Sequence, residues 1–265
     1  MNGALSALIK RHNEVGLSKA KVIPWSCPVP SFGDPFRAKI ATLGLNPSNR
    51  EFVDRSGSEL IGAARRFHTL TSLGLSRWSD ATLMHTRLIW DCCKTYFSRN
   101  PYDIWFKQLD HLLGDTTASY YGDQSGACHL DLIPFATACK WTDLSHRQRD
   151  FLFSIAGNAL GVLLRDSPVQ VLVLNGRSVV VNFERVAGIE LKKEAMKGWE
   201  LLRSSRLNVA GIAYKGVITR LSGVPLKRRV LVIGFNHNIQ SSFGVTREVR
   251  DSIRSWIGRT IRWAS

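Results

Sequence analysis

Three apolar runs in this sequence have the composition of buried strands. Polar side chains stand at the end of each run or shortly after it. The run 39–45 ends at Asn46-Pro47-Ser48, a second run passes through Asp131, and the run 229–234 leads to His237. An amide, a carboxylate and an imidazole work through hydrogen bonds and proton transfer. Because ligands bind outside the carboxyl ends of the strands in open α/β sheets, these three strand ends predict an active site.

Several other kinds of chemistry are not supported by the motifs present. The sequence has no Gly-rich phosphate-binding loop of the usual spacing, and its Gly-x-Ser segments lack the surroundings of a nucleophilic serine. His129 and Asp131 would face the same side of a strand, but His146 and His237, the nearest third ligands, stand at no spacing typical of a metal site. The five cysteines form no Cys-x-x-Cys pair, which argues against zinc and against a disulfide framework. We therefore expect no metal, no cofactor and a reducing, cytoplasmic location.

Strand and helix patterns alternate along the chain, which predicts a parallel sheet between helix layers, a three-layer α/β/α sandwich. We expect one domain over residues 1–265, with an N-terminal surface helix and loop in 1–37 and the α/β/α core in 38–265. The predicted strands are Ala38–Leu45, Cys128–Phe135, Val169–Leu174 and Arg229–Phe235, with antiparallel pieces at Trp199–Arg203 and Asn208–Ile218. The predicted helices are Met1–Leu17, Ser58–Leu73, Asp80–Phe97, Tyr102–Leu113, Asp143–Arg165, Ser178–Val186 and Val245–Trp263.

The chain is strongly basic, with 36 Lys and Arg against 21 Asp and Glu and a net charge of +15. Between positions 192 and 229 there are ten basic residues and only two acidic ones, and the C-terminal helix adds a basic face. A charge of this size predicts a nucleic acid partner rather than a merely solvated surface. The aromatic residues are spread along the chain and no apolar run approaches membrane-spanning length, so we expect no membrane contact. We expect a monomer.

The three strand ends also have recognisable motifs. They are Gly44-Leu45-Asn46-Pro47-Ser48, then His129-Leu-Asp131-Leu-Ile-Pro134-Phe135, then Gly234-Phe-Asn236-His237-Asn238-Ile-Gln240-Ser-Ser242. In these motifs and in their order, from about Ala38 to the end, the chain resembles the uracil-DNA glycosylase superfamily. The first motif is closest to the mismatch-specific branch, which has Gly-Ile-Asn-Pro-Gly. The resemblance implies an α/β/α fold with a central four-stranded parallel sheet and, because the spaced cysteines are missing, no iron–sulfur cluster.

The resemblance also implies roles for individual residues in hydrolysing the N-glycosidic bond of a nucleotide flipped out of DNA. Asn46 would hold the attacking water through its amide oxygen, and His237 would place an N–H near the oxygen of the departing base. Asp131 would read the base, and Phe52 or Phe135 would stack on it unless they belong to the core. The residues expected to contact DNA are Pro47, Ser48, Asn49, Arg50, Asn238, Gln240, Ser241, Ser242 and Arg247.

Asp131 departs from the superfamily pattern, in which the uracil readers usually have Asn. An Asn amide donates and accepts along the edge of uracil, whereas an ionised Asp only accepts and so suits an exocyclic amino group such as N4 of cytosine. Excision of ordinary cytosine would be ruinous, which favours a modified cytosine, either damaged or from hypermodified phage DNA. If Asp131 merely caps a loop, the uracil or thymine-mismatch activity is favoured again.

The late motif departs as well, because Asn238 and Ile239 follow His237 where the superfamily often has His-Pro-Ser. The wedge that fills the gap left by the flipped base is therefore expected among Gln240, Ser241 and Ser242. A catalytically silent DNA-binding protein of the same fold is the main rival to an enzyme. A nucleoside hydrolase is disfavoured, because a neutral nucleoside needs no such positive surface.

Overall fold

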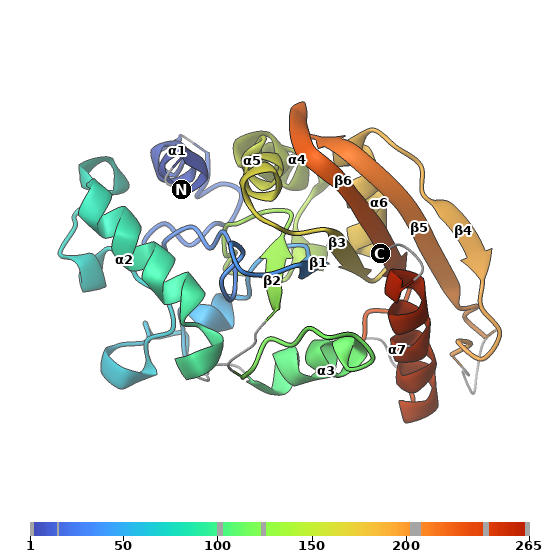
Figure 1. Ribbon diagram of the computed structural model, residues 1–265. Helices are drawn as coiled ribbons and strands as arrows, with labels where there is room; N and C mark the ends of the chain where they lie inside the picture. The colour runs from blue at the N-terminus through green and yellow to red at the C-terminus, as the bar shows by residue number, and fades with distance from the viewer. Residues whose placement is uncertain are drawn as a thin grey trace.

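A six-stranded mixed sheet forms the centre of the protein (Figure 1). The computed structural model describes residues 3–14, 16–99, 103–122, 126–201, 208–240 and 244–262. The strands stand side by side in the order β2-β1-β3-β6-β5-β4. In chain order they are β1 (Ile40–Gly44), β2 (Ala127–Asp131), β3 (Val171–Asn175), β4 (Lys192–Ala195), β5 (Ile212–Leu221) and β6 (Val224–Phe235).

This sheet differs from the four-stranded parallel sheet that we expected. Strands β2, β1, β3 and β6 are parallel, but β5 and β4 extend the sheet with antiparallel pairs. The turn between β5 and β6 accounts for the change of direction. Leu221 pairs with Val224, and Ser222 and Gly223 between them have φ angles of 47° and 78°. Two-residue turns with positive φ at both positions join antiparallel neighbours.

Helices lie on both sides of the sheet. In Figure 1, α1, α4 and α5 lie together on one side, and α3 and α7 lie on the other. The contacts between elements agree with this grouping, since α1 packs on α5 and α3 packs on α7. The helices are α1 (Gly3–Arg11), α2 (Leu83–Lys94), α3 (Asp103–Leu113), α4 (His146–Ala156), α5 (Ala159–Asp166), α6 (Arg177–Ala187) and α7 (Arg247–Arg262).

The predicted helix 58–73 is wrong. These residues form an irregular chain with short 3₁₀ turns. Their backbone pairs with the N-terminal segment instead: the Cys27 N–H donates to the His68 carbonyl at 3.1 Å, and the Leu70 N–H donates to the Trp25 carbonyl at 2.9 Å. Bonds to a distant segment have replaced the local bonds that a helix would use.

The predicted helix 143–165 is two helices, α4 and α5. Gly157 lies between them with a φ of 54°, which is outside the right-handed helical region. The other helices lie where they were predicted, within a few residues at each end, apart from α1, which ends at Arg11 rather than Leu17. The predicted ends at Tyr102 and Trp263, and part of the predicted piece 199–203, fall outside the described residues.

The apolar core is one connected cluster that includes side chains from the first helix to the last. Next to β2 it is rich in aromatic rings, and the Phe32 ring lies 5.3 Å from Phe67, 4.8 Å from Tyr96 and 5.1 Å from Phe106. The loop that precedes β1 is therefore part of the core. In the part of the chain that the structure describes, no helix is long and apolar enough to cross a membrane.

Candidate active site at the carboxyl edge of the sheet

The loops that follow β1 and β2 run side by side beyond the carboxyl edge of the sheet. Gly44 and Asp131 are register partners at the ends of these strands. Beyond them, the Leu132 N–H donates to the Gly44 carbonyl at 3.1 Å, and the Ile133 N–H donates to the Leu45 carbonyl at 2.9 Å. The first two predicted site motifs are therefore neighbours in space.

The side-chain amide of Asn46 has a defined orientation. Its Nδ2 donates to the Pro47 carbonyl at 3.1 Å and to Thr137 Oγ1 at 3.0 Å. The Thr137 hydroxyl donates its own proton to the Cys139 carbonyl at 2.8 Å, so it only accepts from Asn46. These bonds decide which end of the amide is the nitrogen, and the oxygen Oδ1 takes no part in them.

Asp131 is a buried carboxylate beside a buried histidine. His129 Nε2 lies 3.6 Å from Asp131 Oδ1, and the two side chains are 2% and 3% exposed. Thr42 Oγ1 is 2.7 Å from His129 Nδ1 and also hydrogen-bonds to the Tyr120 hydroxyl. The two ring nitrogens of His129 therefore face different groups, Nδ1 the Thr42 hydroxyl and Nε2 the Asp131 carboxyl group. This chain of contacts orients the histidine toward Asp131.

Because Gly44 has no side chain, the Asp131 carboxyl group can occupy the space beside it. A Cβ atom at position 44 would overlap Asp131 Oδ1 and would lie 3.0 Å from His129 Nε2. We therefore expect Gly44→Ala to lower the free energy of unfolding by roughly 1–3 kcal/mol, the usual cost of overpacking. Gly3→Ala is the control, because a Cβ atom at position 3 meets nothing within 4 Å. Equal stability of Gly44→Ala and the wild type in urea would contradict this placement of Asp131.

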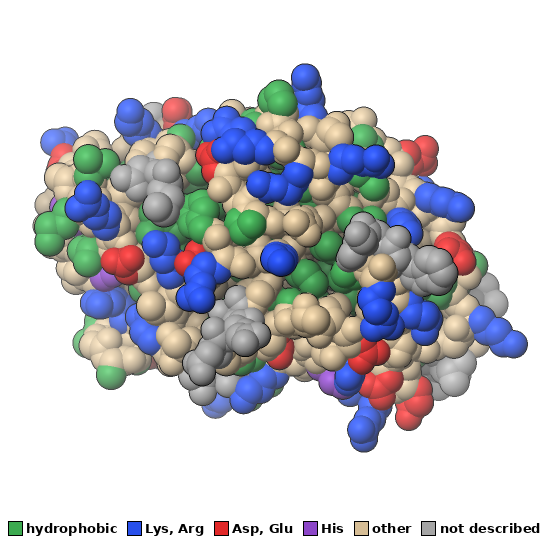
Figure 2. All heavy atoms as spheres, in the orientation of Figure 1, with side chains coloured by type: hydrophobic (Ala, Val, Ile, Leu, Met, Phe, Trp, Pro, Cys, Tyr) green, Lys and Arg blue, Asp and Glu red, His purple; other side chains and the backbone are tan. Residues whose placement is uncertain are grey.

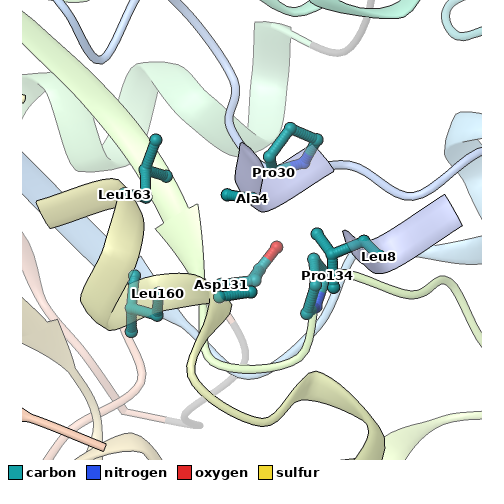
Figure 3. A pocket seen from close by; sticks show the side chains of 8 residues that line it. Ala4, Leu8, Pro30, Asp131, Pro134, Leu160 and Leu163 are labelled. Carbon is teal, nitrogen blue, oxygen red and sulfur yellow. The ribbon is translucent and has the colours of Figure 1, made fainter. Parts of the chain in front are cut away.

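Asp131 lines a small pocket with apolar walls (Figure 3). The pocket has a volume of about 10 Å³, which is room for about one water molecule. A nucleobase does not fit into it in this conformation, so a base can reach Asp131 only after the walls have moved apart. The walls come from α1, from α5 and from two prolines, and they comprise Ala4, Leu8, Pro30, Pro134, Ala159, Leu160 and Leu163.

Glu51 is a second buried carboxyl group at this edge, and no sequence motif singles it out. It closes the 3₁₀ turn Asn49–Glu51, which follows the first motif, and it is 2% exposed. The Tyr96 hydroxyl donates to Glu51 Oε2 at 2.9 Å. Burial is the main reason that the pKa of Glu51 is raised to about 7; the charge of Arg66 and the Tyr96 bond lower this pKa, and the charge of Asp131 raises it. A buried carboxyl group with a raised pKa is a common feature of functional sites.

His237 follows β6, but its ring is bonded away from the first two motifs. Its Nε2 donates to the Trp199 carbonyl at 2.6 Å. Burial lowers the pKa of His237, so the ring is neutral at pH 7 and this bond uses its single N–H. The predicted role, in which an N–H faces the departing base, requires this bond to break. With neighbouring strands about 4.8 Å apart, β6 lies roughly 14 Å from β2.

The ends of β3 and β6 form a second polar cluster around Asn175, a residue that the motifs do not single out. Asn175 Nδ2 donates to Gln240 Oε1 at 2.7 Å, and Asn175 Oδ1 accepts from the Ile239 N–H at 3.3 Å. Asn238 Oδ1 accepts from the Gln240 N–H at 3.1 Å. The late motif is therefore held against the end of β3 through Ile239 and through Gln240, one of the predicted DNA contacts, while the Asn238 side chain bonds within the motif.

Phe52 and Phe135, the two candidates for stacking on a base, are fully buried. The Phe52 ring packs against Phe67 at 5.9 Å, and the Phe135 ring packs against His12 at 5.4 Å. Neither ring has an exposed face on which a base could stack in this conformation. Stacking by either ring stays a prediction that requires the site to open.

The predicted DNA contacts of the first motif lie on one turn at the surface. Ser48 is exposed, and its Oγ accepts from the Arg50 N–H at 3.2 Å, which caps the turn, whereas Pro47 before it is buried. The Arg247 side chain is 83% exposed, and its Nε lies 3.7 Å from an Asp251 carboxylate oxygen. The predicted contacts Ser241 and Ser242 lie outside the described residues.

Basic side chains are spread over the face of the molecule in Figure 2, where acidic ones are fewer. Some of the positive charge is neutralised locally. On α7, Arg254 Nε lies 2.6 Å from Asp115 Oδ1, so the basic face predicted for this helix is partly paired. The net charge of +15 still favours association with a polyanion.

Two further findings concern metal-binding groups and similarity to known proteins. Within the described ranges, no group of three or more His, Cys, Asp or Glu side chains is placed to hold a metal ion. A scan against protein-family models finds no match to the chain, and a search of curated proteins finds no significant match. The likeness to the uracil-DNA glycosylase superfamily therefore rests on the three motifs and their order.

Proposed function

We propose that the protein is a monofunctional DNA glycosylase that flips out a modified, cytosine-type base and hydrolyses its N-glycosidic bond, which leaves an abasic site. The observation that carries the proposal is that Asp131 ends β2 beside Gly44, its register partner at the end of β1, and that Asn46 follows Gly44 by two residues at the same edge of the sheet. The parallel strands β2, β1, β3 and β6, with helices on both sides, support an α/β/α fold like that of the uracil-DNA glycosylase superfamily. The net charge supports DNA as the partner.

In the proposed mechanism, Asn46 positions the attacking water. Its Oδ1 accepts a hydrogen bond from the water and aims the water oxygen at the sugar carbon that bears the base. The bond to the base breaks with its electron pair on the base nitrogen, so the sugar becomes cation-like and orientation matters more than proton removal. The water oxygen then bonds to the sugar carbon, and one proton of the water passes to the base, so that a neutral base and an abasic sugar result. The negative charges of Asp131 and, when ionised, of Glu51 favour this cation.

Asp131 selects the base in this proposal. A carboxylate accepts from the exocyclic amino group of cytosine and repels the carbonyl oxygen that uracil has at the same place. Burial of the Asp131 side chain, which is 3% exposed, strengthens this selection, because a buried acceptor is costly to leave without a donor. Opening of the pocket walls is part of the mechanism, since α1 and α5 close the pocket around Asp131.

The three strand ends have no lysine that could form a covalent Schiff base with the sugar, so the reaction ends at the abasic site. Defence against phages with modified cytosine, or repair of damaged cytosine, would each use this activity. The preference for an amino-bearing base favours the first.

A catalytically silent DNA-binding protein is the second candidate, and two observations favour it. The pocket beside Asp131 holds about 10 Å³, and the N–H of His237 is bonded to the Trp199 carbonyl. A protein that only binds DNA needs neither an open pocket nor a free histidine. The two candidates differ in turnover and not in affinity for DNA.

The test is a set of DNA duplexes with uracil, mismatched thymine, cytosine, hydroxymethylcytosine or glucosylated hydroxymethylcytosine at one position. We expect the wild type to release a modified cytosine only, measured as free base and as alkali-sensitive abasic sites. Asp131→Asn should shift release toward uracil, because an amide can both donate and accept along its edge. Release of uracil or mismatched thymine by the wild type would assign the alternative substrate, and tight binding without any release would favour the silent binder.

A further inference from the structure

A cavity of about 270 Å³ lies between the β4–β5 end of the sheet and α7. Figure 1 shows these elements next to each other, with α7 beside the two antiparallel strands. The cavity is far larger than the pocket at Asp131, and it approaches the volume of small-molecule sites, which starts at about 300 Å³. Its size suits a single nucleotide unit that stays partly in solvent.

The floor of the cavity has two lysines that face each other. Lys192 on β4 and Lys215 on β5 are register partners, and both line the cavity. Like charges directly opposite on one face of a sheet are unfavourable, and an anion between them removes the repulsion. Among the described residues, neither ammonium group has an ion-pair partner within 4.0 Å. Glu194 lines the same floor two residues after Lys192, so the floor also offers one acceptor.

The wall of the cavity is aromatic. Trp256 and Thr260 line it from α7, one helical turn apart. The Trp256 ring stands edge-on to the ring of Trp199, at a centroid distance of 5.5 Å and an interplanar angle of 87°, which holds it in place. Trp256 is only 9% exposed, so it offers a base the edge of its ring and not an open face for stacking. Cationic groups next to an aromatic side chain are a common arrangement where single-stranded nucleic acid binds.

The cavity adjoins the carboxyl edge of the sheet. Ala213, which lines it, is the register partner of Phe235, the last residue of β6. Trp199, which packs on the wall, accepts the hydrogen bond from His237. A strand of DNA that passes the candidate active site can therefore continue into this cavity.

We propose that the cavity binds one nucleotide of a single-stranded stretch of DNA, with its phosphate between Lys192 and Lys215, its base against Trp256, and an exocyclic amino group donating to Glu194. This inference rests on the proposed function for the choice of DNA as the polyanion. Cytosine and adenine supply such an amino group, whereas thymine presents a carbonyl or a methyl group instead. The site therefore prefers cytosine over thymine.

The test measures equilibrium binding of short, unmodified oligodeoxycytidylate and oligothymidylate at several salt concentrations. We expect Lys192→Met to reduce the slope of log affinity against log salt by about 0.7, the value for one phosphate contact to a single strand. Lys193→Met is the matched control, because Lys193 alternates to the opposite face of β4, where its Nζ pairs with Glu190 at 3.4 Å. We expect Glu194→Gln to remove a preference of roughly threefold to tenfold for cytosine over thymine, with Glu190→Gln as its control.

Equal salt slopes for Lys192→Met and Lys193→Met, or no preference between the two oligonucleotides in the wild type, would overturn the inference. The four substituted residues, Glu190, Lys192, Lys193 and Glu194, are exposed, so we expect each variant to fold, which circular dichroism can verify. Because the oligonucleotides have no excisable base, the result does not depend on turnover. If the protein releases no base but shows the expected salt slopes, the proposed glycosylase function would be contradicted and the nucleotide site in the cavity would still be supported.

Discussion

Asn46→Ala is expected to slow base release in single-turnover assays by on the order of 100-fold, while the affinity for DNA stays the same. The amide oxygen is the group that would orient the attacking water. Alanine has only a methyl group in this position, so the variant lacks that oxygen. The side chain is only half-buried, and the turn after it is capped by Ser48, so the fold should tolerate the change. Unchanged release by Asn46→Ala would exclude the residue from catalysis.

A second variant separates orientation of the amide from its mere presence. Thr137→Val keeps the shape of the side chain but removes the hydroxyl that accepts from Asn46 Nδ2 and donates to the Cys139 carbonyl. The amide can then rotate, so we expect a smaller loss, about 10-fold, in the rate of release. In the Asn46→Ala background the same change should cost nothing more, because the group that it orients is gone. Additive losses in the double variant would mean that Thr137 acts only through stability.

The parallel part of the sheet could be predicted because its strands are almost uniformly apolar and buried. All five residues of β1 and all five of β3 are buried, which makes their runs visible without any alternation. Strand β4 could not be predicted in this way. Its four residues, Lys192–Ala195, are all exposed, and they form a strand because β5 offers them a free edge to pair with.

The site residues could be predicted only where their positions depend on residues close to them in the sequence. Asn46 and Asp131 each directly follow or end an apolar strand, so their placement at the carboxyl edge follows from the strand itself. The burial of Glu51 depends on Tyr96, which is 45 positions away, and the orientation of His237 depends on Trp199, 38 positions away. Such contacts leave no periodic signal, because they depend on how separate elements pack.

Glu51→Gln is expected to change how stability depends on pH. The pKa of Glu51 is raised by burial from its ordinary value of 4.5 to about 7. Between these pH values the folded protein holds a proton that the unfolded chain has lost, so the free energy of unfolding falls as the pH rises. Well above pH 7 this ionisation lowers the free energy of unfolding by about 3 kcal/mol in total, relative to a chain without the carboxyl group. Glutamine is neutral throughout, and its amide oxygen can still accept from Tyr96.

The measurement is urea unfolding of the wild type and Glu51→Gln at intervals from pH 5 to pH 8, compared as a difference at each pH. The difference is needed because His12 and His68, whose pKa values burial lowers to about 4, make stability rise over part of the same range in both proteins. Between pH 5 and pH 8 we expect the free energy of unfolding of Glu51→Gln to rise by about 2.5 kcal/mol relative to that of the wild type. Glu14→Gln, at an exposed position, is the control and should follow the wild type. Parallel curves for Glu51→Gln and the wild type would show that Glu51 ionises as it does in the unfolded chain, and Glu51 would then hold no proton at neutral pH beside Asp131.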